Sequence, residues 1–148
     1  MDLFTFIILA AVLGLVYMFA FRSTKKAAKG GDGTEPDTAG YNPNRSQISD
    51  TSRDRFIEDE IEEDLTSVPG IGAGAARELA RGDDGGVHTT HQLIGRFLAM
   101  RRPGMGQRAH CDAMWYFLRD NGVHAHRSGI VRCLAEKCET MMPNIYRN

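Results

Sequence analysis

The segment Val68-Pro69-Gly70-Ile71-Gly72-Ala73-Gly74-Ala75-Ala76-Arg77-Glu78-Leu79 decides how this chain folds. Pro69 ends the short segment from Asp64 to Val68, because the residue before a proline is pushed out of the α region. Gly70 and Gly72 supply a sharp turn, since glycine lets another backbone approach where a Cβ would block it. A new helix then begins at about Ala73. The segment is therefore predicted to form a helix, a tight hairpin and a second helix.

The start of that second helix presents main-chain donors to an anion. Its first N–H groups have no partner within the helix, and the positive end of the helix dipole lies beside the glycines. The pattern apolar-Pro-Gly-Ile-Gly, followed by Ala76 and Leu79 at helical spacing, closely resembles the helix-hairpin-helix motif. That motif usually holds a nucleic-acid backbone without reading bases, because phosphate oxygens are the same at every sequence. The alternative is a glycine-rich turn between two packed helices, or a motif kept as a protein-binding surface.

An apolar run from Leu3 to Phe21 contains no charged residue. Roughly twenty residues, each rising about 1.5 Å, cross the hydrocarbon core of a bilayer. A cleaved signal peptide would need a positive N-terminal region and a small-residue cleavage site, whereas this chain begins Met1-Asp2. Residues 1–22 are therefore predicted to be an uncleaved transmembrane anchor. The bases that follow predict a C-terminal part on the cytoplasmic or nucleoplasmic side: Arg22, Lys25, Lys26 and Lys29.

Residues 23–49 are predicted to be a flexible linker. The stretch from Lys29 to Gln47 is rich in Gly, Pro, Asp, Thr and Asn and has no apolar period, so it cannot bury enough surface to offset its ordering entropy. An arm of about thirty residues would reach roughly 100 Å when fully extended. Charge is divided along the chain: residues 22–63 carry 7 Lys and Arg against 10 Asp and Glu, and residues 64–148 carry 11 against 8. The C-terminal part is thus mildly basic, although the net charge of the chain is −1.

Residues 50–148 are predicted to form a compact five-helix domain of the all-α class that contains the helix-hairpin-helix motif. After N-cap candidates at residues 50–52, one helix face carries Phe56, Ile57, Ile61 and Leu65. Thr89 or Thr90 is expected to cap the next long helix, a further helix runs from about residue 107 to 121, and the last starts near Ser128. No strand pattern appears.

Neither a metal site nor a catalytic site is predicted. Cys111, Cys133 and Cys138 lie among apolar neighbours in helical patterns, which favours reduced core thiols in a reducing compartment. A zinc site built from His88, His91, His110 and Cys111 would lack the paired ligand spacing of zinc fingers, and no cofactor is expected. The clustered carboxylates of residues 58–64 have no matching ligands elsewhere in the chain, so an enzyme is not expected either.

With these elements laid out, residues 51–148 resemble the barrier-to-autointegration factor family, small all-α proteins that bridge double-stranded DNA in animal cells. Five blocks carry the resemblance: Thr51 to Ile57, Ser67 to Gly72, Leu93-Ile94-Gly95-Arg96-Phe97-Leu98, Phe117-Leu118-Arg119-Asp120 and Cys133-Leu134-Ala135-Glu136-Lys137-Cys138. The resemblance implies a homodimer of five-helix subunits with two DNA sites at opposite ends. It also implies a groove for membrane proteins of the LEM-domain type.

The family's contacts with DNA phosphates fall on three parts of this chain: the start of the first helix, the hairpin with the helix after it, and the start of the last helix. By resemblance the DNA-binding residues are Arg53, Arg55, Gly70, Ile71, Gly72, Ala73, Arg77, His126, Arg127 and Ser128. A lysine pair of the family appears here as Arg77-Glu78, and a basic loop position falls near His126, which is charged only in part at neutral pH. Both departures predict weaker DNA binding, because each lost phosphate contact lowers the contribution of counterion release.

The sequence thus predicts a membrane-anchored DNA tether. Its membrane would be the nuclear envelope, where the cargo is chromatin, or the inner membrane of a virion that holds a large viral genome. The alternative is a structural or scaffolding membrane protein whose dimeric head binds protein partners. Glu78 and the modest positive charge of residues 64–148 favour that alternative.

Overall fold

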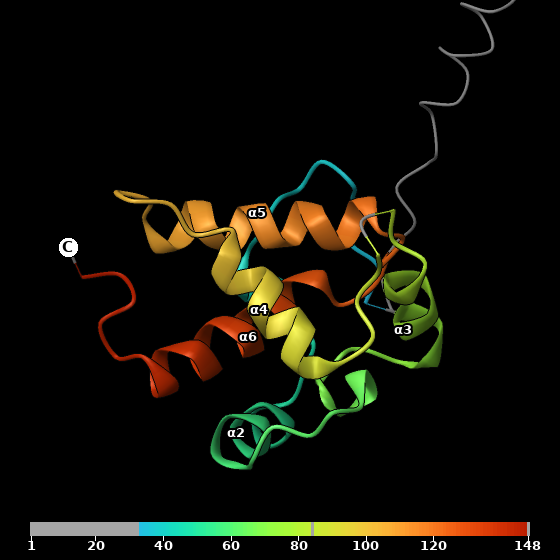
Figure 1. Ribbon diagram of the computed structural model, residues 1–148. Helices are drawn as coiled ribbons and strands as arrows, with labels where there is room; N and C mark the ends of the chain where they lie inside the picture. Colours follow the sequence, from blue (N-terminus) through green and yellow to red (C-terminus); the bar gives the residue numbers. More distant parts are fainter. Residues whose placement is uncertain (1–32, 84, 148) are drawn as a thin grey trace, which may run out of the picture.

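The computed structural model describes residues 33–83 and 85–147 (Figure 1). These residues form five α-helices and two short 3₁₀ turns, and no strand occurs among them. In order they are η1 (Pro43–Arg45), α2 (Asp50–Glu58), η2 (Leu65–Ser67), α3 (Ala73–Ala80), α4 (Thr90–Ala99), α5 (Gln107–Asp120) and α6 (Arg127–Met141). The all-α prediction is therefore confirmed for this part of the chain.

The predicted anchor, Leu3 to Phe21, lies outside the described residues. Within residues 33–83 and 85–147, no helix combines the length and the apolar character that crossing a membrane requires.

The core is built around α6. This helix contacts α2, α4, α5 and η1, and Figure 1 shows it passing behind α4, with α5 above it and α2 below. Ile130 and Leu134 of α6 have no exposed surface, and neither have Trp115 and Leu118 of α5. Burial of such side chains supplies about 1.5–3 kcal/mol each relative to exposure. The positions of α2, α4 and α5 are consequently defined by what they place against α6, whereas α3 packs against η2.

The ends of the later helices follow the signals in the sequence. Thr89 caps α4 through a capping box, because its hydroxyl accepts from the Gln92 N–H while the Gln92 side chain accepts from the Thr89 N–H. Gly122, just after α5, has a φ of +80°, the left-handed conformation that ends many helices. The start of α6 at Arg127 lies one residue before the predicted Ser128.

The first helix is shorter than predicted. The expected apolar face ran from Phe56 to Leu65, but α2 ends at Glu58, and Leu65 is buried in η2 instead. The cause lies in a distant residue: the Lys137 ammonium group donates to the carbonyl of Ile57 at 2.8 Å and to that of Asp59 at 2.5 Å. These bonds satisfy carbonyls that would otherwise continue the helical ladder.

The prediction of a flexible linker up to residue 49 is wrong for residues 33–49. The segment Gly33–Tyr41, called the strap below, lies against α5 and α6, and Glu35 and Tyr41 are only 6% and 9% exposed. The Tyr41 N–H donates to the Asp112 side chain at 2.8 Å. Because these partners lie more than seventy residues away in sequence, the local composition of the strap does not reveal them.

The three cysteines are free and buried, as predicted. Burial raises the pKa of Cys111 and Cys133 to about 12 and that of Cys138 to about 11, so the thiols stay protonated. Among the described residues, no group of His, Cys, Asp and Glu side chains could hold a metal ion.

His110 is a buried polar group of the core. Its Nε2 lies 2.6 Å from the carbonyl oxygen of Phe97, and its Nδ1 lies 2.9 Å from the Tyr146 hydroxyl. The ring stacks on Phe97 at a centroid distance of 4.0 Å. A neutral imidazole satisfies this arrangement, with Nε2 donating and Nδ1 accepting. Burial disfavours the charged form and lowers the pKa of His110 below 6.5.

We expect His110 to make the globular part of the chain, residues 33–147 and called the head below, less stable in mild acid. Because its pKa is lower in the folded state, the unfolded chain binds more protons between that value and about 6.5. The stabilisation is therefore complete above about pH 6.5 and falls as the pH drops below it. Urea unfolding of the full chain in mild detergent, followed by emission of the single tryptophan, Trp115, measures this between pH 5 and 7.5.

The matched variants for this measurement are His110→Phe and His91→Gln. The first should flatten the dependence of stability on pH, and the second, on an exposed residue of α4, should leave it unchanged. An unaltered slope in His110→Phe would contradict the assignment.

Candidate nucleic-acid interface

The hairpin is a rigid turn anchored by apolar side chains. Val68 has no exposed surface and Ile71 is 4% exposed, so both plug the turn into the core. The Ile71 N–H donates to the Val68 carbonyl at 3.0 Å and closes the turn between them. The N–H of Ile71, one of the predicted DNA donors, is therefore already occupied.

Gly70 is the position at which the hairpin presses on α6. Its φ is +92°, a conformation that side chains rarely adopt. A Cβ built there would lie 2.9 Å from Cγ1 of Ile130, 3.0 Å from Cβ of His126 and 3.1 Å from Cδ1 of Ile48. Only glycine fits without moving the backbone.

The start of α3 is an exposed group of main-chain donors. Gly72 is the N-cap, with φ −91° and ψ 178°, and it provides no side-chain cap. The first intrahelical bond runs from the Ala76 N–H to the Gly72 carbonyl at 3.0 Å. The N–H groups of Ala73, Gly74 and Ala75 precede that bond, so they remain available to an acceptor from outside the helix.

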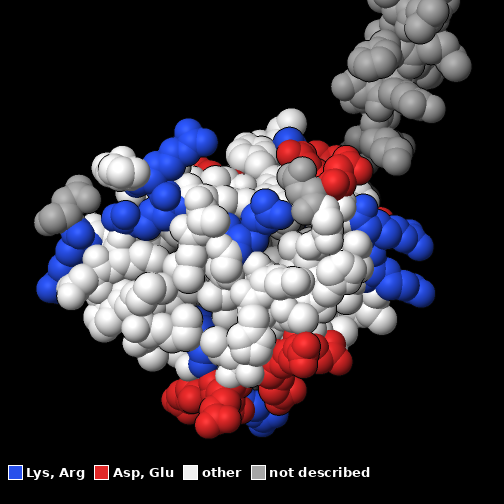
Figure 2. Space-filling view, viewed as in Figure 1, with Lys and Arg blue, Asp and Glu red and all other residues white. Residues whose placement is uncertain are grey.

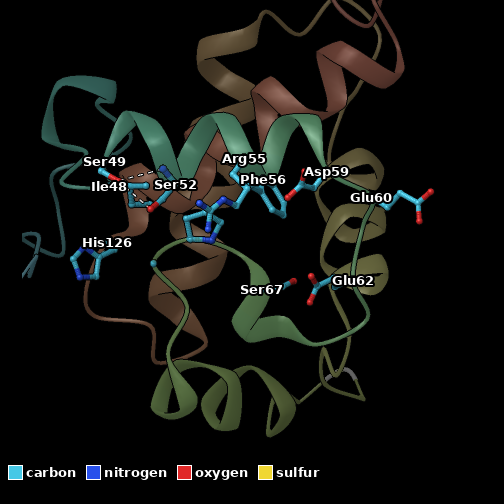
Figure 3. A pocket seen from close by; sticks show the side chains of 12 residues that line it. Ile48, Ser49, Ser52, Arg55, Phe56, Asp59, Glu60, Glu62, Ser67 and His126 are labelled. Carbon is cyan, nitrogen blue, oxygen red and sulfur yellow. Dashed lines mark hydrogen bonds between the residues drawn. The ribbon is translucent and has the colours of Figure 1, made fainter.

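The pocket at these donors is lined by Glu78, and two exposed arginines lie on the same elements as the donors or on the neighbouring cleft. Arg77 lies on α3 and Arg55 on α2, both are exposed, and no described residue forms an ion pair with either. Arg55, Gly70 and His126 line one cleft of about 480 Å³, which brings together α2, the hairpin and the loop before α6 (Figure 3). The structure therefore joins three separate sequence segments at one edge of the molecule.

Charge around this cleft is unevenly distributed. Asp59, Glu60 and Glu62 line the end farther from His126. Figure 2 shows acidic side chains at the bottom of the view, over α2 and the connection to η2, and a second acidic group at the upper right, while basic side chains project below that group at the α3 side. A polyanion would approach from the α3 side and avoid the acidic end.

Arg53 was predicted as a DNA contact, but its charge is neutralised within the head. Its guanidinium lies 2.8 Å from Asp50, 2.9 Å from Asp54 and 3.2 Å from Glu136, and its side chain is only 17% exposed. Three carboxylates leave no net attraction for a phosphate at this point, so the prediction for Arg53 is corrected.

Arg127 and Ser128 were also predicted to contact DNA, and both are fully buried beneath the strap. The Glu35 carboxylate accepts from the Ser128 N–H at 2.6 Å, from the Ser128 hydroxyl and from the Trp115 indole N–H at 3.1 Å. The Arg127 guanidinium donates to the carbonyl of Glu35 and to the side chain of Asp37, the latter at 3.1 Å. In this conformation neither residue can reach a phosphate.

His126 lies where the strap meets the hairpin. Its φ of +59° places a non-glycine residue in the left-handed region, a strain that structures tolerate mostly at functional positions. The His126 N–H donates to the Gly33 carbonyl at 2.8 Å, and a Cβ on Gly33 would fall 2.2 Å from the imidazole. Its buried Nδ1 has no hydrogen-bond partner among the described residues.

Of the predicted site residues, the structure thus leaves Arg55, Gly70, Gly72, Ala73 and Arg77 together at an accessible edge. The list of predicted site residues included Ala73 but not Gly74 and Ala75, although the rule on the first helical turn, applied to the sequence, covers all three N–H groups. It also missed the strap, for which a lone Tyr41 in a polar stretch was the one available signal.

Comparison with known proteins provides no further assignment: no protein-family model matches this chain, and neither a curated protein nor a solved structure does. The family resemblance therefore stays a prediction from the quoted residues.

The two hairpin glycines should respond differently to substitution. We expect Gly70→Ala to lower the free energy of unfolding by about 1–3 kcal/mol, because of its positive φ and its contacts with Ile130 and His126. Gly72→Ser should change it by no more than about 0.5 kcal/mol, since the site is open and the backbone suits an N-cap. Urea unfolding of the full chain measures both, and equal effects would contradict this geometry.

Proposed function

We propose that this chain is a membrane-anchored protein that binds and bridges double-stranded DNA without reading its sequence. The observation that carries the proposal is the uncapped start of α3, where the N–H groups of Ala73, Gly74 and Ala75 have no partner within the helix, with exposed arginines at Arg55 on α2 and Arg77 on α3. Backbone amides at a helix start suit the oxygens of a phosphodiester. Such donors contact phosphate and do not distinguish bases.

The number of available cations sets the strength of this interaction. Arg55 and Arg77 are the two exposed arginines at this edge, whereas Arg53 and Arg127 are neutralised by carboxylates and main-chain acceptors. Two phosphate contacts predict a slope of about −2 for the logarithm of the association constant against the logarithm of salt concentration. Each head therefore binds weakly by itself, and stable attachment depends on several heads acting together.

Bridging requires a second copy, and α4 offers the surface for it. Figure 2 shows that the face over α4 is mostly uncharged. Gly95, in the middle of α4, is exposed, and nothing lies within 4 Å of where its Cβ would be. A mid-helix glycine costs up to about 1 kcal/mol relative to alanine, so close approach of a partner helix is the reason we infer for it. A dimer through α4 would carry two copies of the hairpin.

The strap shortens the distance between the membrane and the DNA. If residues 1–22 are the anchor, only residues 23–32 connect it to the head. Ten residues span at most about 36 Å. Because Gly33 contacts His126 beside the hairpin, the chain enters the head at the edge that we assign to DNA. The nuclear envelope and the inner membrane of a large DNA virus both fit such a tether.

A scaffolding role is the second candidate. It is favoured by the neutralised guanidinium of Arg53 and by the buried start of α6, which together remove contacts that the family resemblance implies. A head of this kind would bind protein partners of the dimer and ignore DNA.

A flotation assay tests the proposed function in one step. The full chain is reconstituted into zwitterionic vesicles, which are then floated through a density gradient with labelled random-sequence duplex DNA. We expect protein and DNA to rise together at low salt and the DNA to be lost as salt increases, because the contacts are phosphate contacts. Gly72→Asp should abolish co-flotation without unfolding, since a carboxylate at the N-cap would accept from the α3 amides and repel phosphate.

Gly106→Asp is the matched control for this assay. Gly106 is also an uncapped, exposed glycine N-cap, that of α5, and nothing lies within 4 Å of its Cβ position. It should bind DNA as the wild type does. DNA that remains at the bottom while the protein floats would exclude DNA binding by the wild-type chain, and protein that remains at the bottom would exclude the anchor.

The α4 interface has its own test. We expect Gly95→Gln to convert a dimer into a monomer while leaving the fold intact, because the side chain has room in the single subunit but not between two helices. The mass of the full chain in detergent, measured by light scattering, reports the change. Gly74→Gln, also at an open helical glycine, should remain dimeric. A Gly95→Gln variant with the wild-type mass would place the interface elsewhere.

A further inference from the structure

We propose that the strap autoinhibits the head: its Glu35 carboxylate occupies the donors at the start of α6, where the family resemblance implies a phosphate contact, until a DNA phosphate displaces it. This inference rests on the proposed function, because the displacing ligand is a DNA phosphate. It adds that the head is autoinhibited by its own chain.

The start of α6 is surrounded by buried hydrogen-bond donors that suit an anion. The Ser128 N–H, the Ser128 hydroxyl and the Trp115 indole N–H all donate to the Glu35 carboxylate, and each of these three residues is at least nine-tenths buried. The start of α6 adds the positive end of its dipole. A carboxylate and a phosphate accept from the same kinds of donor at a helix start, so the oxygens of a phosphodiester could replace those of Glu35.

A cation completes this set of donors. The Arg127 guanidinium has no exposed surface and lies 4.2 Å from the centroid of the Trp115 ring. It is held by the Glu35 carbonyl, by the Val123 carbonyl at 3.3 Å and by Asp37, while its Nε has no hydrogen-bond partner among the described residues. Removing the strap would expose a cation with unused donor capacity beside the α6 amides.

The strap is held largely by polar contacts, which include an antiparallel bridge from Thr34 to Ala125 and hydrogen bonds from the Glu35 N–H to the His124 carbonyl and from Arg119 to the Asp37 carbonyl. Its side chains are mostly polar, and Asp37, which pairs with Arg127, is itself 72% exposed. Gly33 and Gly40 have φ values of +78° and +68°, and the residues between them carry both acidic contacts. Tyr41, which follows Gly40, packs into the core. Rotation at Gly40 would therefore lift residues 33–39 at the cost of the Ala39 contact with the core, while Tyr41 keeps its place.

The start of α6, which Glu35 occupies, lies next to the hairpin and the open start of α3. His126 lines the hairpin cleft, its N–H holds Gly33, and Arg127 and Ser128 follow directly. A duplex bound at the α3 amides would thus bring its phosphate backbone close to the strap, and the negative charges of Glu35 and Asp37 would be repelled toward release.

The test measures DNA affinity and strap position on the same sample. The full chain in mild detergent is titrated with labelled duplex DNA at fixed salt, with anisotropy reporting binding and Trp115 emission reporting the strap. Trp115 is the single tryptophan, and its N–H bonds Glu35. We expect wild-type emission to shift to longer wavelength as DNA binds. Glu35→Gln should bind DNA about tenfold more tightly, because a larger fraction of it is in the open state.

Two further variants serve as controls. Glu139→Gln removes the same charge at the far end of α6, where the carboxylate accepts only from Gln107, and should bind like the wild type. Asp37→Asn loosens the strap without placing an amide in the buried site, and should bind about threefold more tightly even if Glu35→Gln fails to fold.

The outcomes separate the two proposals. DNA that binds the wild type without moving Trp115 emission, or strap variants with wild-type affinity, would overturn the autoinhibition and leave the proposed function standing. DNA binding by Glu35→Gln but not by the wild type would support autoinhibition strongly. No binding by any variant would overturn both proposals together.

Discussion

The close contact between Gly70 and α6 is the constraint on which the rest of the head depends. The backbone of the hairpin touches Ile130, His126 and Ile48 at one point, so the turn, the buried helix and the chain leading into α2 must be in register there. Since α6 also contacts α2, α4 and α5, the direction of the exposed α3 amides is set by the central helix. The donors are therefore preorganised, and a bound phosphate would not have to order them.

Two helix starts meet at this edge, and they are in opposite states. The start of α3 has no side-chain cap and is exposed, whereas the start of α6 is covered and its donors are used by Glu35. Local propensity does not explain the difference, because neither helix has a capping side chain at its own N-cap. It arises from the strap, which brings an acidic residue to α6 from more than ninety positions away. The chain thus supplies the Glu35 carboxylate to the start of α6 and leaves the start of α3 open to an anion from outside.

The periodic parts of the head could be predicted from the sequence, and the long-range polar contacts could not. Apolar spacing and the Thr89 cap identify α4, and similar spacing identifies α5 and α6, because those signals are local. The end of α2 depends on the Lys137 ammonium, the long-range part of the charge compensation at Arg53 depends on Glu136, and the strap depends on Trp115 and Ser128. Each of these is a pairing of polar groups that lie far apart in the sequence, and such a pairing produces no periodic pattern of residues. The hairpin could consequently be identified from local signals, whereas the sequence did not reveal which cations are paired with carboxylates. The assignment of DNA to this edge stays a prediction.

The strap also links occupancy of the second site to the reach of the tether. With the strap seated, the connection from the proposed anchor ends at Gly33. If phosphate displaces residues 33–39, the connection lengthens by seven residues, or about 25 Å of extended chain. A head that has engaged DNA would then stand farther from the membrane than an empty head, which makes room for a duplex about 20 Å wide between them. On the two proposals together, an empty head would stay close to the bilayer with its second site closed, and binding energy from DNA would extend the tether.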